Sequence, residues 1–73
     1  MYLVKYRRWP SPVRPVLYPF KAICRKSHEE AFELANLIDG LEAEVEVCTQ
    51  VLLHGKLRWQ AIPEDEWKEE KRD

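Results

Sequence analysis

The period of the hydrophobic pattern changes at Gly40 from that of a helix to that of a strand, and this change strongly constrains the fold. Over residues 28–39, apolar side chains recur at three- and four-residue steps, the pattern of an amphipathic helix. Ser27 and Glu30 have the spacing of a capping box at its start. Gly40 is expected to end it in the left-handed conformation. Over residues 43–53, apolar and polar side chains alternate, which predicts a strand with one buried face.

Three further segments complete the pattern. Residues 2–9 alternate and predict a first strand, and the prolines that follow predict an extended connection over residues 10–16. A second strand begins near Phe20, and residues 56–62 alternate again. The side chains expected to face the helix from the second strand are Tyr18, Phe20, Ala22 and Cys24.

The loop before the last strand can be deduced from which side chains share a face. A two-residue turn at His54 and Gly55 would place Val51 opposite the basic Arg58. A three-residue loop that starts one residue earlier, with Gly55 left-handed in a bulge, brings the apolar faces of the two strands together. This register predicts that Trp59 is buried.

These elements predict an α+β fold of order ββαββ, a mostly antiparallel sheet with one helix packed on one face. Residues 1–62 form the expected single domain, and residues 63–73 form either a short C-terminal helix docked by Trp67 or an acidic tail. If the first strand pairs with another chain, the order shrinks to β-α-β-β, and an edge strand allows a homodimer by strand addition. The expected core is Tyr2, Val4, Tyr6, Phe20, Val45, Val47, Val51, Leu57 and Trp59.

Length and composition bound the class of protein. The chain has 73 residues, of which 45% are hydrophobic and 34% charged, enough apolar side chains for one small folded domain but not for two. It has no apolar run of about 18 residues to span a bilayer. The opening segment 1–8 reverses the basic-then-apolar order of a secretory signal. We therefore expect a cytoplasmic protein with no membrane partner.

The net charge of −1 conceals a strong segregation of charge along the chain. Residues 1–26 contain seven basic residues and no acid, for a charge of +7, whereas residues 27–73 contain thirteen acids and five bases, for a charge of −8. One interpretation is a basic surface for an acidic partner. The other is that the two halves neutralise each other through ion pairs across the sheet.

The cysteines and histidines do not have the spacing of a zinc site. Structural zinc takes close ligand pairs, whereas Cys24 is near His28 and Cys48 is about 20 Å from His54 along an extended strand. The predicted faces place Cys24 inward and Cys48 outward, which disfavours a disulfide. Neither histidine has an obvious catalytic partner in its loop, and no glycine-rich phosphate loop is present in the sequence. We expect no metal, no cofactor and no enzymatic activity.

Basic and aromatic side chains are expected on and around the sheet face that the helix leaves open. Trp and Arg are enriched anchors at protein interfaces, and the same types neutralise phosphates and stack on bases. The predicted partner-binding residues are Lys5, Arg7, Arg8, Trp9, Arg14, Lys21, Arg25, Lys26 and Arg58.

The first functional hypothesis is a small non-catalytic protein-binding module, an inhibitor or regulator of a larger protein or nucleoprotein complex. The β-α-β-β layout that remains without the first strand also occurs in small phage-encoded inhibitor proteins, an analogy of layout without shared motif residues. The alternative is a nucleic-acid-binding domain that uses the same surface, although Glu44 and Glu46 on that face would repel phosphates. A third, weaker hypothesis is an enzyme or a metal protein. The interpretation without a binding surface is that the proline-rich segment or the Trp67 tail covers this face.

Overall fold

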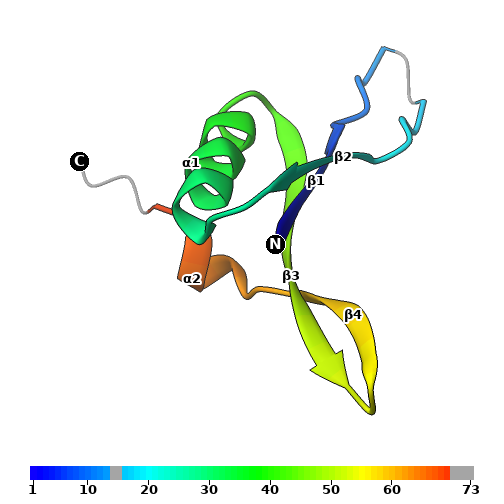
Figure 1. The fold of residues 1–73 in the computed structure, drawn as a ribbon. Helices are drawn as coiled ribbons and strands as arrows, with labels where there is room; N and C mark the ends of the chain where they lie inside the picture. The colour runs from blue at the N-terminus through cyan, green and yellow to red at the C-terminus, as the bar shows by residue number, and fades with distance from the viewer. Residues whose placement is uncertain (14–15, 70–73) are drawn as a thin grey trace.

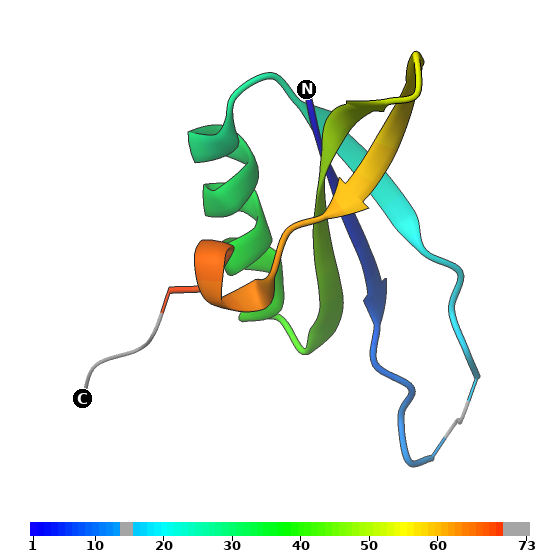
Figure 2. The same cartoon turned by 90° about the horizontal axis from the view of Figure 1, so that it is seen from below.

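The computed structural model describes residues 1–13 and 16–69. Four antiparallel strands form one sheet in the order β2-β1-β3-β4, and both helices lie on the same face of it (Figure 1 and Figure 2). This architecture confirms the predicted α+β fold with ββαββ order. Within the described residues, no helix is long and apolar enough to cross a membrane. The elements are β1 (Tyr2–Arg8), β2 (Lys21–Arg25), α1 (His28–Asp39), β3 (Ala43–Leu53), β4 (Lys56–Ala61) and α2 (Glu64–Trp67).

The start of α1 follows from its predicted cap. The Ser27 hydroxyl accepts a hydrogen bond from the Glu30 backbone N–H at 3.2 Å, which satisfies one of the free donors of the first turn. Glu29 and Glu30 place negative charge at the positive end of the helix dipole. These local interactions explain why the helix begins at the predicted residue.

The end of α1 differs from the prediction in its conformation. Gly40 donates its N–H to the Asn36 carbonyl at 3.3 Å but is right-handed, with φ −70°. The left-handed residue is Glu42, with φ 57°. The chain therefore reverses two residues later than expected, and the reversal allows the Glu42 carbonyl to accept from the Trp9 N–H at 3.2 Å, just beyond the end of β1.

The core lies between α1 and the two central strands. Val4 of β1 and Val47 of β3 are directly opposite each other and fully buried. Ala31 and Ala35 face them from α1, and their small side chains allow the helix to approach the sheet closely. Trp67 of α2 completes the cluster. Partly buried side chains around this cluster are Tyr2, Phe32, Leu34, Ile38, Val45 and Ile62.

The face of the sheet that the helices leave open is called the outer face below. Cross-strand partners share a face, so the register assigns every strand residue to one side. The outer face consists of Leu3, Lys5, Arg7, Ala22, Cys24, Glu44, Glu46, Cys48, Gln50, Leu52, Leu57, Trp59 and Ala61.

The predicted facing of the second strand is wrong by one residue. Ile23 is paired with Val4 and therefore faces α1, whereas Ala22 and Cys24 lie on the outer face. As an edge strand, β2 contributes one partly buried apolar side chain, so pairing with β1 decides its facing rather than its own apolar pattern. Phe20 is likewise not a core residue, since its side chain is exposed.

The predicted loop of the β3–β4 hairpin is also wrong. Leu53 pairs with Lys56 across a two-residue turn, and both turn residues are left-handed, His54 at φ 51° and Gly55 at φ 75°. Such a turn matches the twist of the strands it connects. The facing argument fails because the hairpin extends past the helices, where neither face is covered (Figure 1).

The new register moves two predicted core residues to the outer face. Trp59 lies opposite Gln50 and is 43% exposed, and Leu57 lies opposite Leu52 and is 67% exposed. Leu52 is 69% exposed on the same face. The predicted burial of Trp59 and Leu57 is therefore contradicted, and the hairpin carries an exposed apolar cluster.

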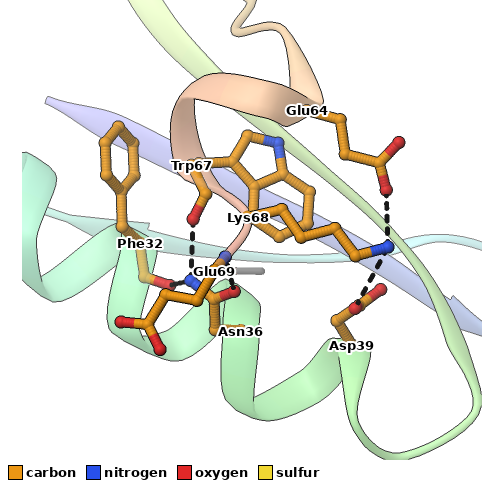
Figure 3. A network of polar contacts seen from close by, with 7 residues as sticks. All are labelled: Phe32, Asn36, Asp39, Glu64, Trp67, Lys68 and Glu69. Carbon is orange, nitrogen blue, oxygen red and sulfur yellow. Dashed lines mark hydrogen bonds and ion pairs between the residues drawn. The ribbon is translucent and has the colours of Figure 1, made fainter. Parts of the chain in front are cut away.

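The C-terminal segment adopts the helical alternative, and Trp67 docks it with only 4% of its surface exposed. Asn36 of α1 holds the segment in place through its side chain (Figure 3). Its Nδ2 donates to the carbonyls of Trp67 at 2.7 Å and Phe32 at 2.8 Å, and its Oδ1 accepts from the Glu69 N–H at 2.8 Å. A second link is Lys68, whose Nζ is 3.0 Å from a Glu64 oxygen and 3.5 Å from an Asp39 oxygen.

Candidate partner-binding surface

A concave site lies where β1 ends and β2 begins, on the helix side of the sheet but beyond the core. Tyr6 and Lys21 are cross-strand partners there, and Arg8 extends the same face by one step. The connection that precedes β2 closes the site from the other side. We call this site the basic cleft; it encloses about 310 Å³ and is lined by Tyr6, Arg7, Arg8, Tyr18, Pro19 and Lys21.

The cations of the basic cleft differ in how far they are already neutralised. Arg7 donates from Nε to a Glu44 carboxylate oxygen at 2.7 Å, and its guanidinium carbon lies 4.4 Å from the centre of the Phe20 ring. Arg8 and Lys21 form no ion pair with any residue that the structure describes. These two cations are therefore the unneutralised positive charges of the cleft among the residues that the structure describes.

The outer face is nearly balanced in charge, in contrast to the cleft. Lys5 lies directly opposite Glu46, and Arg7 is bridged to Glu44. The Nζ of Lys5 lies 5.3 Å from the centre of the Phe20 ring, so this ring lies against both outer-face cations. The interpretation that the two halves of the chain pair across the sheet therefore holds for the outer face. It does not hold for Arg8 and Lys21.

The other predicted binding residues are spread around the molecule. Trp9 follows Arg8 directly and is 62% exposed. Lys26 is exposed just before α1, and Arg25 lies on the helix side in a shallow depression with Glu30 and Glu33, its Nη1 donating to the Cys24 carbonyl at 2.9 Å.

Arg58 and Arg14 are separate from the cleft. Arg58 lies opposite Val51 on the helix side of β4, at the other edge of the sheet from β2. Arg14 lies outside the described residues. The structure thus groups Arg7, Arg8 and Lys21, with Trp9 next to them, and separates Arg25, Lys26 and Arg58 from this group.

Sequence reasoning did not identify the aromatic walls of the cleft. Tyr6 was expected in the core because it alternates with Val4, and it does lie on the helix side, but partly exposed. Tyr18 was also expected to face the helix, and Pro19 was not among the predicted binding residues. The available signal was that Tyr18 and Pro19 directly precede β2, which places them opposite the end of β1.

Both cysteines are free thiols on the outer face, which corrects the expected inward position of Cys24. Cys24 of β2 and Cys48 of β3 lie opposite Leu3 on either side of β1. The two cysteines are therefore two strand spacings apart, about 10 Å, which is too far for a disulfide. Burial, a hydrogen bond from its Sγ to Glu46 Oε1 at 3.4 Å and the charge of that carboxylate raise the pKa of the Cys48 thiol; the charge of Lys5 opposes them. No cluster of three or more metal-ligating side chains occurs in the described part of the chain.

Comparisons with known proteins give no match. No protein-family model, curated protein or solved structure matches this chain.

Proposed function

We propose that this chain is a small non-catalytic protein-binding module that holds an acidic segment of a partner protein in the basic cleft, and that it acts as an inhibitor or regulator of that partner. The observation that carries the proposal is the composition of the cleft. Arg8 and Lys21 lie there without an ion-pair partner among the described residues, and Tyr6 and Tyr18 line the same cleft. Basic and tyrosine side chains in a concave site are typical anchors of protein interfaces.

The size of the cleft favours a peptide over a nucleic acid. A volume of about 310 Å³ accommodates one or two side chains, not a stretch of backbone with several phosphates. Nucleic-acid affinity depends on many phosphate contacts, and the neighbouring outer face, where Glu46 and Glu44 balance Lys5 and Arg7, offers phosphates no net positive charge. A carboxylate on a flexible partner segment needs only the two cations.

We further propose a cytoplasmic setting for this activity. The exposed thiol of Cys24 and the buried thiol of Cys48 are both free, and free thiols persist in a reducing compartment.

The test is a binding titration of the purified chain with a fluorescent oligoglutamate peptide, followed by anisotropy. A double variant, Arg8→Glu with Lys21→Glu, reverses both cations of the cleft. We expect its affinity to fall about tenfold or more, because it loses two exposed charge contacts worth up to about 1 kcal/mol each and adds repulsion. Affinity capture from the host, compared between the same proteins, then identifies the partner.

The matched control is a second double variant, Lys26→Glu with Arg58→Glu, which makes the same change in net charge away from the cleft. Its affinity for the peptide should stay close to that of the original chain. If both variants lose affinity equally, the binding reflects net charge alone and the cleft is not the site.

The nucleic-acid alternative is tested by a separate gel-shift experiment. Gel shifts with single-stranded and duplex oligonucleotides at about 50 mM salt should show no complex under the proposal. A complex whose affinity falls steeply as salt increases would favour the alternative and reject the protein-binding assignment.

A further inference from the structure

The β3–β4 hairpin has no support from the rest of the fold near its tip. β1 pairs with β3 only as far as Thr49, and β4 is exposed along its whole length. The hairpin projects from the body of the molecule in both views (Figure 1 and Figure 2). Two-stranded ribbons are marginally stable alone in water, and this one exposes Leu52, Leu57 and Trp59 on one face.

The register shows which backbone groups of β4 are unpaired. In a two-residue hairpin the closing pair, here Leu53 and Lys56, exchanges both backbone hydrogen bonds, and every second residue after it does the same. The bond from the Ile62 N–H to the Val47 carbonyl at 2.7 Å has the same phase. The N–H and C=O groups of the alternate residues therefore point away from β3. These residues are Leu57, Trp59 and Ala61.

We propose that β4 pairs with β4 of a second copy of this chain, antiparallel and centred on Trp59, to form a symmetric dimer with one continuous sheet. In this register Trp59 lies opposite Trp59 of the second copy, and Leu57 lies opposite Ala61. Every outward N–H and C=O of the strand then has a partner. Large side chains meet small ones beside the central tryptophans, so Leu57 and Trp59 gain apolar cross-strand neighbours.

Charge complementarity supports the pairing of β4 with a second copy of itself. On the helix side the same register places Arg58 opposite Gln60 and Lys56 opposite Ile62, so no two like charges meet. The chain after Ile62 continues into acidic residues at the start of α2, which brings negative charge of one copy towards Lys56 of the other. The pairing ends at Pro63, which has no N–H to donate.

Other registers and the other edge strand fit less well. Shifting the centre by one residue to Arg58 would oppose two arginines, and shifting it to Gln60 would bring Pro63 into the ladder. At the other edge, β2 pairing with its own copy about Ile23 would place Lys21 opposite Arg25. The backbone and the charges thus select β4 centred on Trp59.

Sedimentation equilibrium over a range of concentrations tests the dimer. The expected result is a species of twice 8.8 kDa in the original chain and a monomer in Trp59→Lys, which puts two charges face to face at the centre. Trp59→Thr, which retains a strand-forming residue, should also weaken the dimer and serves if the lysine variant does not fold. The matched control is Trp9→Lys, the same change at an exposed tryptophan outside β4, which should leave the dimer intact.

Amide hydrogen exchange gives a second readout at single residues. In the dimer the amides of Leu57, Trp59 and Ala61 should be protected as well as those of Arg58 and Gln60, and in Trp59→Thr only the latter two should stay protected. A chain that remains monomeric up to about 1 mM, or a dimer that survives both Trp59 substitutions, would overturn the proposal. Peptide binding by the basic cleft is measured separately, so either proposal can fail alone.

Discussion

At the scale of single residues, the two glycines of the chain have opposite conformational requirements. Gly40 is right-handed, and an added Cβ would make only ordinary contacts, with the Leu37 carbonyl oxygen at 3.5 Å and the Asn36 carbonyl oxygen at 3.8 Å. Gly55 has φ 75°, where side chains are strained. We expect Gly40→Ala to raise the free energy of unfolding by about 0.4–1 kcal/mol through loss of unfolded-state entropy, and Gly55→Ala to lower it by about 1–2 kcal/mol. Urea unfolding of the two variants checks this order, and a destabilised Gly40→Ala would contradict it.

Cys48 makes the stability depend on pH in the alkaline range. Its thiol has a pKa above the ordinary 9.0 because of burial first and Glu46 second, so the folded state favours the neutral thiol. The resulting contribution to stability is present below about pH 9 and is lost as the pH rises from 9.0 through the higher folded pKa. The unfolding free energy of Cys48→Ala should therefore fall less steeply above pH 9 than that of the original chain. Urea unfolding of both proteins at a series of pH values checks this, and an equally steep fall in both would contradict it.

At the scale of elements, Asn36 is the residue through which α1 holds α2. Its side chain makes three hydrogen bonds of 2.7–2.8 Å to backbone groups, two of them in the C-terminal segment. Asn36→Ala should lower the free energy of unfolding by about 2–3 kcal/mol, since each bond contributes about 1 kcal/mol. It should also increase the exposure of Trp67. Asn36→Asp retains the acceptor for the Glu69 N–H but places a carboxylate oxygen against the carbonyl oxygens of Phe32 and Trp67, so a loss at least as large is expected in the same denaturation experiment.

Features of the fold that depend on neighbouring residues in the sequence were predicted well, and features that depend on contacts between distant segments were not. The bounds of α1 follow from the Ser27 cap and an apolar stripe within twelve residues, all of which are local. The facing of β2 and the register of the β3–β4 hairpin depend on which parts of the sheet the helices cover. Because α1 does not extend over the hairpin, burial does not select the register of the hairpin. The turn at His54 and Gly55 selects it instead.

At the scale of the whole molecule, the charge segregation of the sequence is partly neutralised in space. Arg7, Arg8 and Lys21 are all predicted binding residues, and they come together because neighbouring antiparallel strands bring the end of β1 to the start of β2. The bridge from Arg7 to Glu44 was not predictable from the sequence, because Glu44 comes from β3 and a different part of the chain. The aromatic walls of the cleft were not predictable either, since their position depends on the path of a proline-rich connection.

The two proposed surfaces lie at opposite edges of the sheet, and this arrangement has a measurable consequence. The basic cleft is at the β1–β2 edge and the proposed dimer forms through β4, so dimerisation leaves both clefts open. In an eight-stranded sheet the two β2 strands would be about 34 Å apart across the strands, from seven spacings of about 4.8 Å. A dimer would therefore present two acid-binding sites to a partner that displays more than one acidic segment.

We expect this bivalence to appear as avidity. On a surface densely coated with oligoglutamate peptide, the original chain should dissociate at least about tenfold more slowly than Trp59→Thr, because the second site rebinds at high effective concentration. On a sparsely coated surface, where two peptides cannot be reached together, the dissociation rates should converge, since each cleft is unchanged by the substitution. Surface plasmon resonance at the two densities makes the comparison. A Trp59→Thr variant that is weaker at both densities would mean that Trp59 contacts the peptide itself, and the separation of the two surfaces would then be wrong.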